Sequence, residues 1–525
     1  MHQAEIIVLL LAFVVAIVVA ARRLKQPYPV VLVLAGLAVS FVPGLPRIEL
    51  NPNVFFFYFL PALLYPAALF TSWRDFRRNL GEILLLAIGL VLATMLVVAS
   101  VAHAFLPVLP WASAFALGAI VSPPDAIAAT SVIRRLSVPH RIETILEGES
   151  LVNDATALVA LQFAVAAALT GKFSATAAAG QFVLVALGGV AFGLAVGFVM
   201  RWVQARLDDP PVQITISLLT PFLAYLPAER IHVSGVLATV TAGIYLGWHS
   251  PLVLTPRFRL QAFAFWQVIV FLLNGFVFIT IGLQLPGILR DLRGYSLGEL
   301  IVQAVLVSAA VVLVRIGWVF VATYLSRLFA RTAREKESVS WRNVAVIAWA
   351  GMRGVISLAA AFALPFTADG TAFPGRNYIL FLTFSVILTT LVFQGLTLPL
   401  LIGKLGVKDD GATDEEERSA RIAANSAALG YIDALAGQAG TPNDVLLRLR
   451  AEYDDRMREL EACCSATGNP SGEVATPQYQ QLQQEALKIE RETIIDLRNR
   501  QVINDEALRR IQRDLDLAEA RLTGF

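Results

Sequence analysis

Long apolar runs recur along the first three quarters of the chain, and they constrain its fold more than any other feature. Apolar windows of about eighteen or more residues are typical of helices that cross a bilayer. With 57% hydrophobic and 16% charged residues, the 525-residue chain is predicted to be an all-α, polytopic membrane protein. Thirteen spans are predicted, at roughly 4–21, 29–45, 52–70, 80–106, 111–136, 142–170, 178–205, 211–227, 232–249, 261–285, 297–328, 343–366 and 377–402.

Basic residues are unevenly distributed between the loops that join these spans. Alternate loops carry 18 basic residues and the others carry six. Since basic loops stay in the cytoplasm, the N-terminus is predicted outside and the C-terminus inside. The first apolar run starts without basic residues and is interpreted as a retained helix, not a cleaved signal peptide.

The acidic end of the chain differs from the rest in composition. Residues 1–403 carry 26 basic and 17 acidic residues, whereas residues 404–525 carry 16 and 23. The first part is therefore predicted to be the transmembrane domain and the second a cytoplasmic helical tail. Its charged helices are predicted at about 413–437, 440–464 and 475–521.

Two of the predicted spans contain helix-breaking sequences. The fifth span contains VSPPDAIAA (121–129), in which two prolines remove two amide donors, and the twelfth contains GMRGVIS (351–357). Unwound backbone at membrane depth is tolerated where it is buried or lines a wet cavity. Two such breaks, seven spans apart, suggest corresponding positions of two repeats and point to the binding site of a secondary transporter.

Few ionisable residues fall deep inside the predicted spans. They are Asp125, Glu149 and Asp154 on the acidic side and Arg315 and Arg353 on the basic side. Each is a functional candidate, because an unpaired charge in the bilayer core costs several kcal/mol. An alternative interpretation of Arg315 is structural: its long side chain could reach from a long tilted span to the membrane surface. Glu147, nearer a helix end, is interpreted as a residue at a wet rim.

The stretch EGESLVND (147–154) arranges its polar residues on two neighbouring helix faces. Glu149 and Asn153 share one face, and Ser150 and Asp154 share the next. Glu149 is predicted to form a structural ion pair with Arg353, which stays charged. Asp154, left without a fixed cation, would bind either a proton or a small cation through its oxygens, and that competition suffices for cation/proton exchange.

GESLVND, SPPDAIAA and GMRGVISLA together resemble the bacterial sodium/proton antiporters of monovalent cation:proton antiporter family 1. The resemblance covers the membrane part, and the ending VINDEALRRIQRDLDLAEARL is similar to the helical tail of bacterial members. It implies a homodimer in the bacterial cytoplasmic membrane, with inverted repeats, a dimerisation domain and a mobile core of two crossed broken helices that moves as an elevator. It also implies a role in pH homeostasis and sodium tolerance.

The resemblance also implies roles for individual residues. Asp154 would be the ion and proton carrier, preceded by Asn153, and Ser150 would be the hydroxyl ligand of Na⁺. Asp125 matches the aspartate of the Thr-Asp-Pro motif at the first break.

The chain departs from the family pattern at three positions. The threonine and proline of that motif are Pro124 and Ala126 here, so a backbone carbonyl near Pro123 or Pro124 is expected to face the ion instead. In the third span, Pro66 stands where some relatives carry an acidic ligand.

Stoichiometry is predicted from Asn153. The resemblance implies a comparison with antiporters that carry two adjacent aspartates at this point and exchange two protons per sodium, whereas the amide of Asn153 binds no proton. One-for-one, electroneutral exchange is therefore expected.

Enzymes and channels are the other function classes to which a chain of this composition could belong. The Tyr-Asp and Gly-x-Gly-Asp pair of intramembrane aspartyl proteases and the His-Glu-x-x-His zinc motif do not occur, so no enzyme is predicted. A channel is a further alternative, although channel filters are usually rings contributed by several subunits. A K⁺/H⁺ antiporter with the same mechanism remains open. No cofactor and no nucleic-acid partner are predicted; the partners are monovalent cations, protons and membrane lipid.

Overall fold

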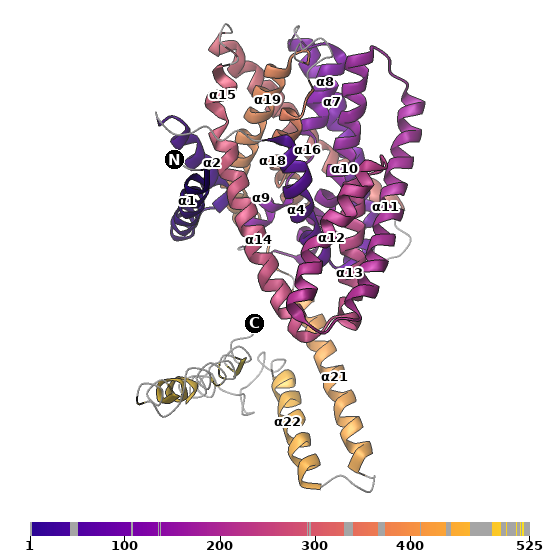
Figure 1. The fold of residues 1–525 in the computed structure, drawn as a ribbon, viewed down its shortest axis with the longest axis vertical. Helices are drawn as coiled ribbons and strands as arrows, with labels where there is room; N and C mark the ends of the chain where they lie inside the picture. The colour runs from indigo at the N-terminus through magenta and orange to yellow at the C-terminus, as the bar shows by residue number, and fades with distance from the viewer. Residues whose placement is uncertain are drawn as a thin grey trace. The chain divides into compact units, whose positions relative to one another are not determined.

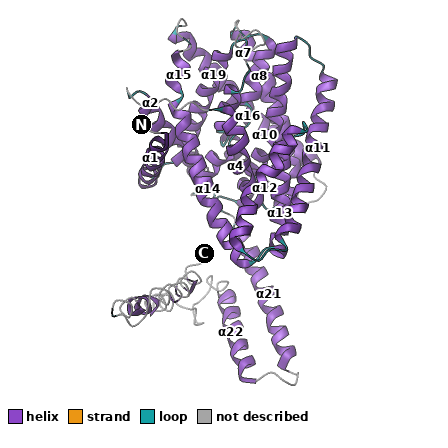
Figure 2. Ribbon diagram, in the orientation of Figure 1, coloured by secondary structure: helices purple, strands orange, loops and turns teal. Residues whose placement is uncertain are grey.

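The structure is a computed structural model that describes most of the chain. The described residues are 3–42, 51–106, 109–134, 136, 138–290, 292, 296–329, 340–365, 373–409, 411–436, 443–462 and 486–494, with 500, 511, 515, 517 and 518. They form helices and turns and no strand (Figures 1 and 2). The prediction of an all-α protein is confirmed for them. Two compact units are distinguished, Met1–Asp410 and Gly411–Phe525.

Each of the thirteen predicted spans coincides, at least in part, with helix. The first half of the membrane unit consists of α1 (Gln3–Arg23), α2 (Tyr28–Ser40), α3 (Pro52–Val54), η1 (Phe55–Phe59), α4 (Leu60–Phe70), α5 (Trp73–Arg78), α6 (Leu80–Leu84), η2 (Leu85–Leu90), α7 (Val91–Phe105), α8 (Trp111–Val121), α9 (Ala126–Ile133) and α10 (His140–Thr170). The second half consists of α11 (Ala175–Gln204), α12 (Pro210–Arg230), α13 (Gly235–Val253), α14 (Pro256–Leu283), α15 (Leu285–Arg290), α16 (Leu297–Phe329), α17 (Trp341–Trp349), α18 (Val355–Phe362), α19 (Arg376–Thr389), η3 (Thr390–Gln394) and α20 (Gly395–Leu405). The elements η1, η2 and η3 are short π-helical stretches that continue into the neighbouring α-helices.

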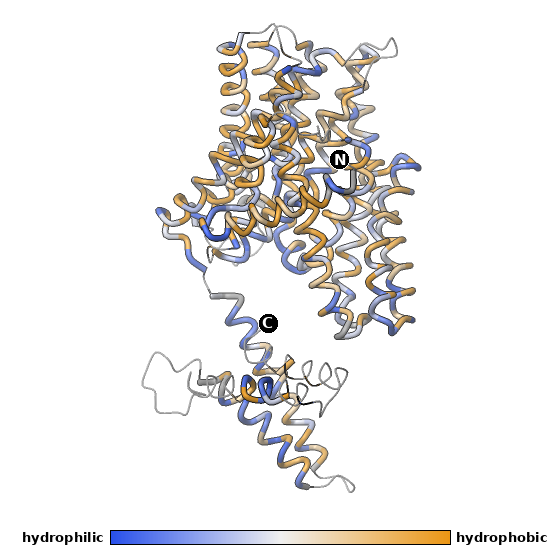
Figure 3. Tube along the Cα trace, turned by 60° about the vertical axis from the view of Figure 1, so that its left-hand side comes forward, coloured by the Kyte–Doolittle hydropathy of each residue, from blue (hydrophilic) through white to orange (hydrophobic). Residues whose placement is uncertain are grey.

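Apolar residues run along these helices, and polar residues gather near their ends (Figure 3). Among the described residues, nine helical segments are long and apolar enough to cross a membrane. This count takes directly joined elements, as in Pro52–Phe70, as one segment, and also α8 and α9 across their break, as in Trp111–Ile133. A multi-pass membrane protein is therefore confirmed. The count of thirteen crossings, their orientation and the inverted repeats stay predictions.

Both predicted helix breaks are present. The first separates α8 from α9 at residues 122–125, where Asp125 is extended and its Oδ1 accepts from the Ile127 amide at 2.9 Å. The second separates α17 from α18 at residues 350–354. The breaks form where the sequence removes amide donors or side chains, at Pro123 and Pro124 and at the glycines of GMRG.

Helix α11 packs closely on α13 through glycines spaced four residues apart. Gly189, Gly193 and Gly197 are buried on α11. A Cβ atom at Gly193 would lie 2.4 Å from the carbonyl oxygen of Ala238, so a larger residue there would push the helices apart. Small residues at this spacing are a common way for membrane helices to approach each other.

The second unit contains a helical hairpin. Helices α21 (Ala412–Ala436) and α22 (Asn443–Ala462) pack against each other and are joined by an ion pair of Arg450 with Asp433 at 2.5 Å. These helices match the first two predicted tail helices. Most of the third, at 475–521, lies outside the described residues.

Candidate ion-binding site

The two helix breaks are held against each other by hydrogen bonds. The amide of Asp125 donates to the carbonyl oxygen of Met352 at 2.7 Å, so the backbone of one break pairs with that of the other. The guanidinium of Arg353 donates through Nη1 to the carbonyl oxygen of Ser122. The Arg353 amide in turn donates to Thr390 Oγ1 at 3.0 Å, which fixes the second break to η3.

A cavity of about 100 Å³ lies where the breaks meet helix α10. One water molecule needs about 10–15 Å³ by such a measure, so the space is large enough for a small cation with some of its water. Its lining comes from α4, both breaks, α9, α10, α14 and α18. The polar residues among the lining are Asp125, Thr130, Glu147, Ser150, Asp154, Asn274 and Ser357.

Asp154 lies in the wall of this cavity and is 2% exposed. Its Oδ2 has no hydrogen-bond partner among the described residues, which is costly for a carboxylate unless a ligand or a proton satisfies it. The preceding Asn153 is also buried, and its Nδ2 donates to the Pro124 carbonyl oxygen at 3.4 Å. The arrangement leaves the Asp154 oxygen available to a mobile ion.

Ser150 lies one turn before Asp154, and both line the cavity. Its Oγ accepts from the Ala126 amide at 3.5 Å, at the start of α9. The structure therefore brings together the predicted Ser150, Asn153, Asp154 and the first break. Their roles in binding an ion remain predictions.

The predicted Glu149–Arg353 ion pair is wrong. Glu149 pairs with Arg315 of α16 through two hydrogen bonds, Nη1 to Oε1 at 2.7 Å and Nη2 to Oε2 at 3.0 Å. Both side chains are 1% exposed. The bidentate geometry suits a guanidinium and a carboxylate, and it removes the snorkelling interpretation of Arg315. The sequence could not show which arginine pairs with Glu149, because Arg315 and Arg353 both lie deep inside predicted spans. The packing of α16 against α17 brings Arg315 to α10.

Arg353 lies within electrostatic range of both Glu149 and Arg315, but its hydrogen bond goes to a helix end. It donates to Ser122, the residue that caps the C-terminus of α8. Arg315 likewise donates to the Ile347 carbonyl oxygen, in the last turn of α17, at 3.1 Å. Two cations thus lie at the two C-terminal helix ends that the breaks create, where unpaired carbonyls carry partial negative charge.

Asp125 lies at the opposite kind of helix end. It caps the N-terminus of α9, and its carboxylate packs against Gly354, which caps the N-terminus of α18. A Cβ atom at Gly354 would lie 1.9 Å from Asp125 Oδ2. Negative charge at helix N-termini is stabilising, so Asp125 complements the two arginines across the breaks.

Glu147 lines the cavity on the same face of α10 as Ser150 and Asp154. Its Oε1 accepts from Arg134 Nη2 at 2.9 Å, and Arg134 also contacts Glu143. Both partners are partly exposed, with 64% of the Arg134 side chain and 25% of the Glu147 side chain accessible. This position agrees with the predicted rim.

Three polar lining residues, Thr130, Asn274 and Ser357, were not singled out from the sequence. Ser357 Oγ is buried and has no partner among the described residues, and Asn274 of α14 is 2% exposed. Ser357 lies three residues after Gly354, so its position in GMRGVIS was the available signal. The α4 wall is formed by Leu60, Leu63, Leu64 and Ala67 rather than by a carboxylate, as Pro66 suggested.

The donor set suits a small hard cation. All its polar lining groups offer oxygen, and oxygen ligands are those that group I and group II cations prefer. Among the described residues no cluster of three or more His, Cys, Asp or Glu side chains could hold a metal ion. The lining therefore offers one carboxylate oxygen without a partner, on Asp154, beside hydroxyl and amide oxygens.

Two apposed helix breaks around a buried carboxylate define a secondary transporter of cations. A model of the family described as "Sodium/hydrogen exchanger, transmembrane" matches residues 9–404. An uncharacterised Na⁺/H⁺ exchanger of Mycobacterium tuberculosis is 36% identical over 523 residues, covering 98% of this chain and 96% of the relative. The chain belongs to the sodium/hydrogen exchanger family, whose members are secondary transporters and not enzymes.

Further relatives agree with this assignment. A sodium, potassium, lithium and rubidium/H⁺ antiporter of Bacillus subtilis is 37% identical over 410 residues, covering 75% of this chain and 61% of the relative. The sodium proton antiporter MjNhaP1 from Methanocaldococcus jannaschii shares the fold, with a TM-score of 0.60 and 21% identity, over 77% of this chain and 98% of that one. The resemblance inferred from the motifs is confirmed.

The Glu149–Arg315 ion pair predicts the outcome of two double-mutant cycles. Glu149→Gln or Arg315→Gln leaves a buried charge unpaired and is expected to destabilise the protein by about 3–5 kcal/mol. The Glu149→Gln/Arg315→Gln variant should lose less than the sum of the single losses, because it removes both charges. Thermal unfolding in detergent measures each term.

The matched cycle of Glu149 with Arg353→Gln is the control. Its coupling should be smaller, since Arg353 makes no hydrogen bond to Glu149. Equal or larger coupling in this second cycle would restore the Glu149–Arg353 pair.

Gly354→Ala is expected to disrupt the site. The added Cβ would collide with the Asp125 carboxylate and push the two breaks apart, so exchange in everted vesicles should fall at least tenfold while the protein still reaches the membrane. Gly317→Ala on α16 is the control, because nothing lies within 4 Å of its added Cβ. Wild-type exchange by the Gly354 variant would show that the contact of the breaks is not needed.

Proposed function

We propose that this protein exchanges Na⁺ for H⁺, one for one, with both ions competing for the carboxylate of Asp154. The observation that carries the proposal is the contrast between two buried carboxylates on α10. Glu149 is bound by a guanidinium, whereas Asp154 has an oxygen without a partner in a cavity large enough for a cation. A buried carboxylate in that state is stabilised either by a proton or by a cation, and one excludes the other.

The cation site proposed around Asp154 includes Ser150 as a hydroxyl ligand. The carbonyls of Pro123 and Pro124 are further candidates from the first break, although the Pro124 oxygen already accepts from Asn153. Ser357 adds a second unpartnered hydroxyl from α18. Asn153 and Asp125 are assigned positioning roles, because both are held by hydrogen bonds to the first break.

Alternating access is proposed to occur by an elevator movement. The moving body would contain α8, α9, α10, α16, α17 and α18. Hydrogen bonds join the two breaks, and the Glu149–Arg315 pair joins α10 to α16. The large apolar cavity between α10 and the pair α11 and α13 supports a sliding boundary there. A homodimer in the bacterial cytoplasmic membrane, with the N-terminus outside and the C-terminus inside, completes the proposal.

Potassium is the second candidate for the transported cation. The Bacillus subtilis relative is named for sodium, potassium, lithium and rubidium, and oxygen ligands serve all four ions. A series of these chlorides in everted vesicles, with proton movement as the readout, distinguishes the candidates.

Asp154→Asn is expected to abolish exchange at every pH while leaving the protein folded. The amide has nearly the same shape as the carboxylate but binds neither a proton nor a counter-charge in this range. Dequenching of a pH-sensitive dye in everted vesicles measures exchange, and size-exclusion chromatography measures folding. The matched control is Asp208→Asn, an exposed aspartate between α11 and α12, which should behave as wild type. Robust exchange by the Asp154 variant would refute the assignment.

Exchange is further predicted to be insensitive to membrane voltage. Asn153 replaces a second aspartate, and Glu149 is neutralised by Arg315. Glu147 at the rim is paired with Arg134, and Asp125 is held at a helix N-terminus, which leaves Asp154 as the one proposed titrating carrier. Proteoliposomes clamped with potassium and valinomycin, with Na⁺ as the transported ion, test this. A rate or end-point that follows the clamped voltage would reveal a second proton carrier, and Asp125 would be examined first.

A further inference from the structure

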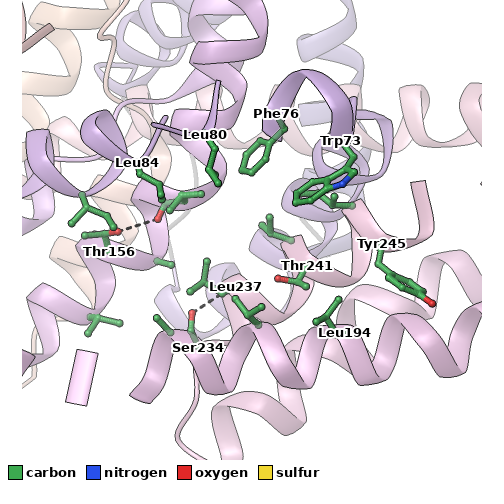
Figure 4. A pocket seen from close by; sticks show the side chains of 18 of the residues that line it. Trp73, Phe76, Leu80, Leu84, Thr156, Leu194, Ser234, Leu237, Thr241 and Tyr245 are labelled. Atoms are coloured by element: carbon green, nitrogen blue, oxygen red, sulfur yellow. Dashed lines mark hydrogen bonds between the residues drawn. The ribbon is translucent and has the colours of Figure 1, made fainter. Parts of the chain in front are cut away.

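A second and larger cavity, of about 560 Å³, lies on the other side of α10 from the ion site. Its α10 wall consists of Val152, Ala155, Thr156 and Val159, which form a stripe at helical spacing. At about 100° per residue this stripe points away from Ser150 and Asp154. The remaining walls come from α5, α6, α11 and α13 (Figure 4).

The cavity presents hydrocarbon and few free polar groups. Thr156 Oγ1 donates to the Val152 carbonyl oxygen at 3.2 Å, and Ser234 Oγ accepts from the Leu237 amide at 3.2 Å. The hydroxyl of Tyr245 accepts from Arg201 at 3.1 Å. Since most of the lining is apolar and these three polar groups are engaged within the protein, an occupant that is apolar fits the walls.

The cavity opens at the surface of the membrane helices. Three lining side chains are well exposed, Leu84 at 39%, Leu194 at 45% and Trp248 at 56%. Leu84 and Leu194 belong to helices long and apolar enough to cross a membrane, and Trp248 belongs to α13 of the membrane unit. Lipid acyl chains are expected to surround such helices. A volume of this size is in the range of ligand pockets, so the cavity has room for a lipid acyl chain.

One end of the cavity is lined by aromatic residues, and two arginines follow them on α5. Trp73 and Phe76 of α5 stack at 5.9 Å and line the cavity, and Tyr245 lines it from α13, which contacts α5 (Figure 4). Arg77 lies on α5 one turn after Trp73, followed by Arg78, and both arginines are exposed. Aromatic side chains at the membrane interface beside basic residues are typical of sites that bind phospholipid head groups.

We propose that this cavity binds one anionic phospholipid of the bilayer. An acyl chain occupies the apolar space between α10 and the pair α11 and α13, and the phosphate lies against Arg77 and Arg78. The lipid is thereby placed on the back of the helix that carries Asp154. The site does not depend on which ion Asp154 binds.

Photolabelling of the full-length protein in proteoliposomes tests the chain position. The probe is phosphatidylglycerol with a diazirine on one acyl chain, and the labelled peptides are mapped by mass spectrometry. Label is expected on α10 between residues 152 and 159 and on the facing parts of α11 and α13. Label only on the outer surfaces of the helices would overturn the proposal. Because the experiment uses the wild-type protein, it does not depend on the folding of a variant.

Two variants with matched controls sharpen the test. Ala186→Phe, which fills the cavity from α11, should remove the α10 label, whereas Ala191→Phe, at an exposed position of the same helix, should retain it. Arg77→Gln and Arg78→Gln should each lower the affinity for phosphatidylglycerol about fivefold in native mass spectrometry, and Arg22→Gln with Arg23→Gln should not. Equal binding of phosphatidylcholine and phosphatidylglycerol by the wild type, or unchanged label in Ala186→Phe, would contradict the proposed site.

Discussion

The high cost of an unpaired charge in a membrane interior governs the arrangement of this protein's centre. Two helix breaks expose carbonyls and amides at membrane depth, and the ionisable side chains nearby lie where that exposed backbone carries the opposite partial charge. Arg315 and Arg353 meet C-terminal carbonyls, and Asp125 caps an N-terminus. Glu149 is satisfied by Arg315. Among the carboxylates of this centre that the structure describes, Asp154 is the one with a fully buried oxygen that no partner satisfies, and a transported cation or proton could satisfy it.

The two glycines of GMRG make this arrangement possible by taking up no space. A Cβ atom at Gly351 would lie 2.0 Å from Arg315 Cδ, and one at Gly354 would lie 1.9 Å from Asp125 Oδ2. The first glycine lets the Arg315 side chain pass to Glu149, and the second admits the Asp125 carboxylate between the breaks. The glycines of GMRG are therefore needed for more than the break in their own segment. They also leave room for side chains of α16 and of the first break.

The sequence was informative wherever local chemistry decides the structure. Paired prolines and glycines predicted both breaks, and spacing of three and four predicted which residues share a face of α10. It failed where the answer depends on which helices become neighbours. Arg315 and Arg353 are equally deep in their spans, so the choice of partner for Glu149 required the packing of α16, and Ser357 became visible as a lining residue only once α18 was placed beside α10.

The central claim is that one carboxylate, Asp154, exchanges one proton for one cation. Proton release by the purified protein on addition of NaCl, measured near neutral pH with an indicator dye in weakly buffered detergent solution, tests it most directly. About one proton released per Na⁺ bound, with none from Asp154→Asn, is the predicted result. Sodium binding without proton release in the wild type, or undiminished release by the Asp154 variant, would contradict the account.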